Sequence, residues 1–340
     1  MSQMKIEPQH KMPGQPIDFV LLWVDGDDPA WLKEKSNYLP GEGSVLNTNN
    51  SRYRDWGILP YWFRSIERYA PWVRRIHFVT CGHYPQWLNL DHPKLNLVRH
   101  KDFIPFRYLP TFNSHPIENN LHRISGLAEQ FVYFNDDMFI SSPVKPTDFF
   151  INGTPRDCAI RNIPMLYEIG HINLNDINLI NKAFNFKKQY KKHFWKWMNY
   201  RYGIRCLQNL VFTPFIEFTG AKNTHVANAY SKTTFSEVWD KFESILDQTC
   251  QHKFRSVLDV NQWLFKYWQI VSGNFVPQWI NFGKATNIGD LRTIKKAFVG
   301  HKYKLLCMQD CDWMSNMEPL KAEVHQLLES VFPQKSSFEL

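Results

Sequence analysis

The first 135 residues alternate apolar runs with polar segments, and this pattern predicts strands and helices in turn. Continuous apolar runs are typical of strands buried on both faces of a parallel sheet. The predicted strands cover residues 17–24, 74–80, 94–100 and 131–135. Residues 55–69 predict a helix with Pro60 in its first turns, and residues 114–130 predict a helical segment interrupted near Gly126. This order favours an α/β core with a mostly parallel sheet.

After about residue 150 the pattern changes to longer amphipathic segments. Residues 172–210 and 231–271 predict helices, and residues 318–332 predict an amphipathic C-terminal helix. We therefore expect a flexible N-terminus, an α/β core, a mainly helical part that completes the active site, and a C-terminal helix with its tail. The expected bounds of these four parts are 1–16, 17–150, 151–317 and 318–340.

The positive charge of the chain is concentrated in one segment. Residues 182–205 hold eight Lys and Arg and no Asp or Glu, which equals the net charge of +8, so the rest of the chain is balanced. A protein that binds nucleic acid through a uniformly basic surface is therefore not expected. A basic, aromatic-rich segment is typical of a helix on an anionic membrane, or of a groove for an anionic substrate. A solvated basic helix is the plainer alternative.

No apolar run approaches the roughly 18–20 residues that span a bilayer, and the polar, Pro-rich start lacks the apolar part of a signal peptide. These features predict a cytoplasmic protein. The six cysteines are scattered and form no Cys-x-x-Cys pair, so we expect reduced thiols rather than a zinc site or disulfides.

Two acidic motifs follow predicted strands, where open parallel sheets bind ligands. "DGDD" begins at Asp25 after the first strand, and its Asp25 and Gly26 are candidates for nucleotide contact. Asn135, Asp136 and Asp137 end the last core strand, and such carboxylates suit Mg²⁺ or Mn²⁺ against a diphosphate. A capped turn is the alternative. The apolar flanks require that a metal, an Arg or backbone donors compensate these carboxylates.

Residues 109–124 are dense in polar groups. On a helix, Glu118 and His122 would share one face, as would Asn119 and Arg123. Glu118 could then join the two adjacent aspartates around a metal. A cluster of capping and salt-bridge residues explains the same spacing equally well.

His225 and Arg255 are the candidates of the second half. A lone His is more often structural than catalytic, and a lone Arg is usually on the surface. Their spacing leaves open whether the two side chains converge.

Four segments together resemble the Stealth family, the sugar-1-phosphate transferases of bacterial capsule synthesis. An animal relative tags lysosomal hydrolases with N-acetylglucosamine-1-phosphate. The similar segments begin with "DFVLLWVDGDD", "RYRDWGILPYWF", "HVANAYSKTTF" and "KLLCMQDCD", and they run from about residue 18 to 312. The chain departs from the family pattern at Gln309, where Asn is frequent, and at Ala227, where Pro is frequent.

The resemblance implies a Rossmann-like, GT-A-like core that binds a nucleotide sugar. It implies that a UDP-sugar gives its sugar-1-phosphate to a hydroxyl of a glycan or lipid-linked oligosaccharide, which forms a phosphodiester and releases UMP. Such phosphoryl transfer needs in-line positioning and neutralised oxygens.

The resemblance also assigns roles to residues. His225 would be the general base, and Arg255 would neutralise charge on the transferred phosphoryl group. Asp136 and Asp137, with Glu118, would hold or orient a divalent cation. Asp310 would complete the shell around the metal or the phosphate. The donor nucleotide would contact Asp25, Gly26, Asn135 and Arg123.

Two other functions fit parts of the sequence. A conventional UDP-sugar glycosyltransferase, which releases UDP, would use the same strand-end carboxylates. A lectin-like or membrane-associated binding module would need no catalysis. For residues 182–205 we expect peripheral contact with the inner face of the plasma membrane, where lipid-linked glycans are built.

Overall fold

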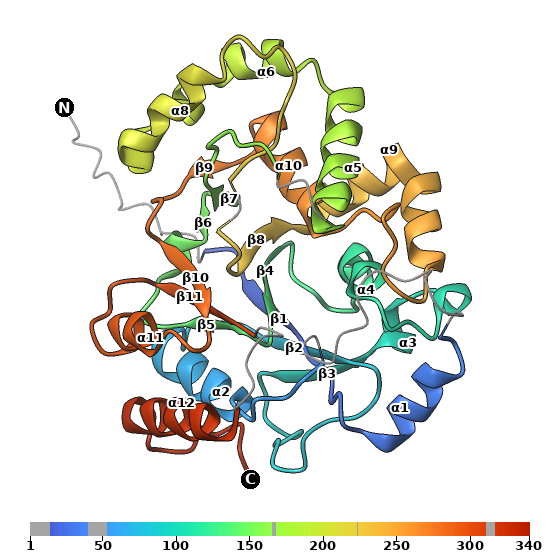
Figure 1. Cartoon of the computed structure of the whole chain (residues 1–340), viewed down its shortest axis with the longest axis vertical. Coiled ribbons are helices and arrows are strands. Elements are labelled where there is room, and N and C mark those ends of the chain that lie inside the picture. The colour runs from blue at the N-terminus through green and yellow to red at the C-terminus, as the bar shows by residue number, and fades with distance from the viewer. Residues whose placement is uncertain (1–13, 40–52, 165–167, 223, 311–316) are drawn as a thin grey trace, which may run out of the picture.

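The computed structural model describes residues 14–39, 53–164, 168–222, 224–310 and 317–340. Of the predicted N-terminal part, residues 1–13 lie outside these ranges. Figure 1 shows a central sheet with helices on both sides and a further group of helices along the edge opposite α12.

The central sheet has five strands in the order β3-β2-β1-β4-β8. Strands β1 to β4 are parallel, and β8 pairs antiparallel with β4. Their bounds are Ile17–Leu22 (β1), Ile76–Thr80 (β2), Leu95–Arg99 (β3), Gln130–Asn135 (β4) and Asn228–Ser231 (β8). The predicted α/β class with a mostly parallel sheet is confirmed, because all four predicted strands form and pair in parallel.

Two smaller sheets flank the central one. The first has the order β10-β11-β5, and the second has the order β6-β7-β9. Their strands are Met138–Ile140 (β5), Phe150–Ile151 (β6), Thr154–Asp157 (β7), Val276–Pro277 (β9), Gly283–Asn287 (β10) and Leu305–Gln309 (β11). Because β11 pairs with β5, residues 305–309 are held directly beside the acidic motif that precedes β5.

The helices of the first half are Pro29–Ser36 (α1), Leu59–Tyr69 (α2), His100–Phe103 (α3) and Ser114–Asn119 (α4). Those of the second half are Glu168–Ala183 (α5), Phe186–Lys192 (α6), Phe194–Trp197 (α7), Cys206–Val211 (α8), Lys232–Gln251 (α9), Gln262–Ser272 (α10), Leu291–Phe298 (α11) and Met317–Val331 (α12). The predicted helical character of residues 172–210, 231–271 and 318–332 is confirmed.

Alternate residues of the central strands feed two cores, as period-two strands require. Phe19 and Phe134 pack toward α2, α11 and α12. Val20 and Tyr133 pack toward α4, α5, α9 and α10. The sheet is therefore covered on both faces, which explains why its strands are continuous apolar runs.

The predicted helical segment over residues 114–130 forms only in part, because it is interrupted earlier than the predicted break near Gly126. The helix α4 ends at Asn119, a 3-10 turn follows at Leu121–Arg123, and Gly126 has a φ of +74°. The buried side chain of Asn120 donates to the carbonyl of Pro116, which offers the backbone an alternative to continued helix. His122 therefore does not share a helical face with Glu118.

The core sheet also takes a strand from beyond residue 150, because β8 lies next to β4 (Figure 1). The predicted parts are thus interleaved in space, and their bounds stay a prediction. The five described cysteines are free thiols, as expected. Among the described residues, no helix is both long enough and apolar enough to cross a membrane.

Candidate active site

A cleft of about 480 Å³ opens at the carboxyl ends of the central strands. Its walls come from the ends of β1, β2, β4 and β11, the start of α2 and α4, and two segments of the second half. The predicted site residues that line it are Asn135, Asp136, Asp137, His225, Arg255 and Asp310. The structure thus brings together side chains separated by up to 175 positions of sequence, from Asn135 to Asp310.

Asp136 and Asp137 form the tight turn between β4 and β5. The backbone N–H of Met308 donates to the carbonyl of Asp137 at 2.8 Å, which fixes the turn against β11. Burial and the neighbouring carboxylates of Asp137 and Asp55 raise the pKa of Asp136 to about 8. Ionising both carboxylates of this turn is therefore costly by itself, and a bound cation would offset that cost.

Asp137, His225 and Cys307 form one compact group, with one ligand atom of each within 4.8 Å of the others. The Cys307 thiol donates to Asp137 Oδ2 at 3.1 Å. Burial and the nearby carboxylates raise the pKa of Cys307 well above its usual range, so the thiol keeps its proton. Burial raises the pKa of Asp137, while His225 and the Cys307 thiol act against that rise.

Arg255 reaches the cleft from the loop between α9 and α10, and its Nη2 donates to Ser114 Oγ at 3.0 Å. Asp259 holds this loop in place: its carboxylate accepts from His115 at 2.8 Å, His252 at 2.6 Å and the backbone of Ser256 at 3.0 Å. Desolvation of Asp259 is outweighed by the two histidines, which lower its pKa to about 2. Asp259 is thus an ionised centre that positions Arg255.

Asp310 pairs with Arg54 at 2.8 Å, and both side chains line the cleft. Asp310 therefore faces a cation supplied by the chain itself. The aromatic rings of Trp31, Tyr53 and Phe112 form part of the same wall. The ring centroid of Trp31 lies 5.1 Å from that of Tyr53 and 5.7 Å from that of Phe112. The cleft thus offers charged groups beside a flat apolar surface.

Glu118 and Arg123 do not line this cleft. Glu118 is buried behind Tyr133, where it accepts from the tyrosine hydroxyl at 3.2 Å and from the backbone of Gln262 at 3.3 Å. Burial raises the pKa of Glu118. Arg123 is exposed, with its guanidinium 4.8 Å from the ring of Trp239.

Asp25 and Gly26 lie beside the cleft, outside the residues that line it. The N–H of Asp25 donates to His83 Nε2 at 2.8 Å, so Nδ1 of that ring carries the proton and donates to Asp28. A Cβ at Gly26 would stand 1.9 Å from the carbonyl oxygen of Tyr53. Glycine is therefore needed for the close approach of the segment that carries Tyr53 and Arg54.

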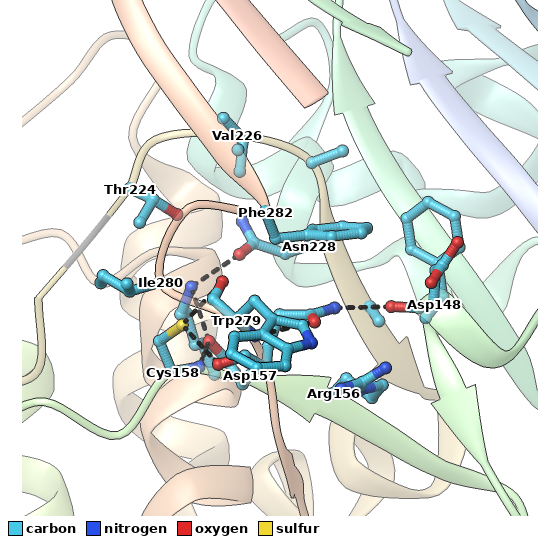
Figure 2. A pocket seen from close by; sticks show the side chains of 16 residues that line it. Asp148, Arg156, Asp157, Cys158, Thr224, Val226, Asn228, Trp279, Ile280 and Phe282 are labelled. Carbon is cyan, nitrogen blue, oxygen red and sulfur yellow. Dashed lines mark hydrogen bonds and ion pairs between the residues drawn. The ribbon is translucent and has the colours of Figure 1, made fainter. Parts of the chain in front are cut away.

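A second, small cavity of about 30 Å³ adjoins the chain on either side of His225. Figure 2 shows the side chains that line it. Residues on both sides of His225, Thr224 and Val226, line it. Buried Lys266 pairs there with Asp157 at 3.2 Å and donates to Asn228 at 2.7 Å. This ion pair supports the start of β8 and the segment that carries His225, whose φ is +46°.

The sequence motifs did not identify Arg54, Asp259 or the thiol of Cys307 as site residues. Arg54 and its partner Asp310 are 256 positions apart, and Asp259 meets His115 across 144. Local spacing carries no signal for such pairs. The density of polar groups around Ser114 was the one available hint that this segment faces a site.

Comparison with known proteins identifies the family. Three regions match: Stealth protein conserved region 1 at residues 15–43, conserved region 2 at residues 52–157 and conserved region 3 at residues 224–268. The chain is 43% identical to the capsular polysaccharide phosphotransferase WcwK of Streptococcus pneumoniae, over 95% of this chain and 98% of that one.

Other relatives match over similar lengths. The exopolysaccharide phosphotransferase cps2G of Lactiplantibacillus plantarum is 38% identical, over 95% of this chain and 96% of that one. The receptor polysaccharide phosphotransferase WefC of Streptococcus oralis is 35% identical, over 95% and 99%.

Among solved structures, the galactosyltransferase LgtC in complex with donor and acceptor sugar analogues is similar, with a TM-score of 0.41 and 11% identity over 92% of this chain and 96% of that one. The apo form of the glycosyltransferase GlyE of Streptococcus pneumoniae has a TM-score of 0.36 and 9% identity, over 96% and 64%. The sequence matches, at more than 30% identity over nearly the whole of both chains, show that this chain is a transferase enzyme of the Stealth family.

Proposed function

We propose that the chain transfers a sugar-1-phosphate from a UDP-sugar to a hydroxyl of a glycan or lipid-linked oligosaccharide acceptor, in capsular or other cell-surface polysaccharide synthesis. The single observation that carries the proposal is the cleft in which Asp136, Asp137, His225 and Arg255 meet. The full-length relatives named polysaccharide phosphotransferases support the reaction class.

The reaction would proceed by attack of the acceptor oxygen on the phosphorus that carries the sugar. The bond from that phosphorus to the oxygen of UMP breaks, UMP leaves, and the new bond forms a phosphodiester. His225 would take the proton of the acceptor hydroxyl, and the neighbouring carboxylate of Asp137 would stabilise the resulting imidazolium. Arg255 would neutralise the transferred phosphoryl oxygens, and its bond to Ser114 sets its direction.

The acidic turn fits a divalent cation, Mg²⁺ or Mn²⁺. Asp137 Oδ1 is buried and has no hydrogen-bond partner within the described part of the chain. Asp136 and Asp137 would hold the ion, because hard cations prefer carboxylate oxygens, and the protonated thiol of Cys307 would orient Asp137 instead of ligating. When bound, such an ion neutralises the diphosphate of the donor. Asp310 would act with Arg54 at the edge of the same site.

The nucleotide released tests the proposal. The purified enzyme is incubated with Mg²⁺ or Mn²⁺, a panel of UDP-sugars and an acceptor glycan, and the nucleotide and the product linkage are identified. UMP and a phosphodiester are expected, whereas UDP and a plain glycosidic bond would show a conventional glycosyltransferase.

Matched variants sharpen this test. Arg255→Lys keeps the charge but loses the planar guanidinium, and we expect a fall in kcat of at least about 100-fold, the order seen when one charge-stabilising donor is removed. Arg123→Lys is the control, because its side chain is exposed and lies outside the cleft. His225→Ala should abolish turnover. Retained biological activity in a folded His225→Ala protein would instead indicate a binding module.

The proposed acceptor is made at membranes, and we include peripheral contact of residues 182–205 with the inner face of the plasma membrane in the proposal. The motive is the charge of this segment, with eight basic residues and no acidic ones. Several of its lysines, on α6, are exposed.

A further inference from the structure

Exposed apolar side chains gather in the segment from residue 195 to 216, here called the apolar arm. Ile204, Trp195 and Val211 are 83%, 77% and 73% exposed. Leu207, Phe215 and Ile216 are more than half exposed as well. Single exposed apolar residues are ordinary, but a group of large ones in one segment marks an interaction surface.

The arm is held rigidly in this outward position. Buried Trp197 and Tyr202 anchor its first half, and buried Asn209 donates to the carbonyls of Ala159 and Trp197. Buried Arg161 donates to the carbonyls of Phe212 and Phe215 at its far end and of Glu217 just beyond it. The exposed side chains are therefore those that the anchored backbone directs outward, and not the result of a loosely packed segment.

Positive charge lies next to this apolar surface. From residue 182 to 216 the sequence has eight Lys and Arg and no Asp or Glu, and all of the basic residues precede residue 206. Lys187, Lys188, Lys191 and Lys192 are exposed on α6. Figure 1 shows α6 and α8 along the same outer edge of the molecule, opposite α12. Basic side chains beside exposed Trp, Ile and Phe have the composition of an interfacial membrane element.

The arm is also connected to the active site. Nine positions separate Ile216 from His225. The ring of Tyr200, on the arm, lies 5.6 Å from that of Trp279, which is half exposed. Trp279 lines the small cavity together with Thr224 and Val226, on either side of His225 (Figure 2).

We propose that α6 and the apolar arm together dock on an anionic lipid bilayer, with the α6 lysines on the headgroups and the arm's side chains in the interfacial layer. Charge complementarity favours this occupant over a second copy of the chain, because two copies would place the same basic α6 surfaces together. Docking holds the His225 segment at the surface where a lipid-linked acceptor is presented. The docking extends the membrane contact proposed above for residues 182–205 to the apolar arm. Only the presentation of the acceptor rests on the proposed reaction; the lipid binding itself does not.

Cosedimentation of the full chain with vesicles tests the docking. Vesicles with about one third phosphatidylglycerol should bind the protein, and pure phosphatidylcholine vesicles should bind it at least tenfold more weakly. Each lysine near an anionic surface contributes about fivefold to partitioning. The charge variant carries Lys187→Gln, Lys188→Gln, Lys191→Gln and Lys192→Gln. It should therefore bind the vesicles more than tenfold more weakly, and added salt should weaken vesicle binding by the parent protein in the same way.

A second variant, Ile204→Ser with Val211→Ser and Phe215→Ser, should lose binding at low salt while its charge is unchanged. Lys295→Gln with Val299→Ser, on and just after α11, is the control for loss of exposed charge and apolar area elsewhere. Circular dichroism and UMP release with a soluble acceptor should match the parent protein in all three variants. UMP release with an acceptor embedded in vesicles should fall at least tenfold in the first two.

Equal vesicle binding by the parent protein, the α6 charge variant and the apolar-arm variant would overturn the proposal. So would a parent protein that ignores vesicles but forms a dimer that Ile204→Ser, Val211→Ser and Phe215→Ser dissociate, because the arm would then be an interface between copies. Vesicle binding without any UMP release would leave the docking surface intact and would refute the proposed reaction only.

Discussion

Replacing Asp259 with Asn should destabilise the protein by roughly 2–3 kcal/mol at neutral pH. The pKa of this carboxyl falls from its ordinary value of 3.8 to about 2 in the folded protein, and a pKa difference of one corresponds to about 1.4 kcal/mol. Because the folded pKa is lowered, the stabilisation is present above pH 4 and is lost as the pH falls toward 2. Asp259→Asn retains the shape and removes the charge that His115 and His252 contact.

Urea unfolding of parent and variant, at pH 7 and near pH 3, measures this difference. The gap in free energy of unfolding should be roughly 2–3 kcal/mol at pH 7 and about half of that near pH 3, where this carboxyl is mostly protonated in the unfolded parent chain but still ionised in the folded one. Asp240→Asn, on an exposed position of α9, is the control and should change stability by less than about 0.5 kcal/mol. A gap below that size for Asp259→Asn at pH 7 would refute the assignment of Asp259 as an ionised centre.

Measuring kcat for the same variants distinguishes a residue that positions Arg255 from one that takes part in the reaction. Asp259→Asn should lower both stability and kcat, because the loop that carries Arg255 loses its anchor. Arg255→Lys should lower kcat with little change in the free energy of unfolding. Equal kcat in parent and Asp259→Asn would show that the loop keeps its conformation without the charge.

Three further changes have defined outcomes. Gly26→Ala places a Cβ 1.9 Å from the carbonyl of Tyr53, and we expect a loss of at least about 2 kcal/mol in urea unfolding, since backbone must shift. Lys266→Met leaves Asp157 as a buried charge without its partner and should cost about 3–5 kcal/mol, whereas Lys266→Met with Asp157→Asn should recover part of it. Mg²⁺ or Mn²⁺ should raise the melting temperature in a concentration-dependent way that a chelator reverses, and Asp137→Asn should abolish the rise; an unchanged rise would remove Asp137 as a ligand.

The sequence predicted the central sheet well because its strands are buried on both faces. Such strands need long apolar runs, and 17–24, 74–80, 94–100 and 131–135 each overlap an observed parallel strand. The strand β8 was not predicted. Only four of its residues pair with β4, and so short a segment has no apolar run that marks it as a strand. The helical segment at 114–130 is interrupted earlier than predicted, because the buried side chain of Asn120 competes with the helical backbone there.

The residues of the candidate site likewise divide into those that local sequence patterns could predict and those that they could not. Residues at strand ends, such as Asp136 and Asp137, were predictable because the strands place them at one edge of the sheet. Glu118 was assigned to the same edge by helical spacing and by the family resemblance. That spacing cannot distinguish a side chain that faces the cleft from one that lies behind Tyr133, where the structure has it. Pairs that depend on long-range packing, such as Arg54 with Asp310, had no local signal.

The two acidic centres of the site illustrate how opposite environments serve one reaction. Asp259 is buried among hydrogen-bond donors that lower its pKa to about 2, so it is ionised at neutral pH without any ligand. Asp136 is held among carboxylates, so its pKa is about 8 and its negative charge is costly unless a positive ion arrives. The first arrangement stabilises the fold and fixes Arg255. The second favours the neutral, protonated form of Asp136 near pH 7, so a bound cation would displace that proton. This difference is why we assign the cation to the acidic turn and the scaffold to Asp259.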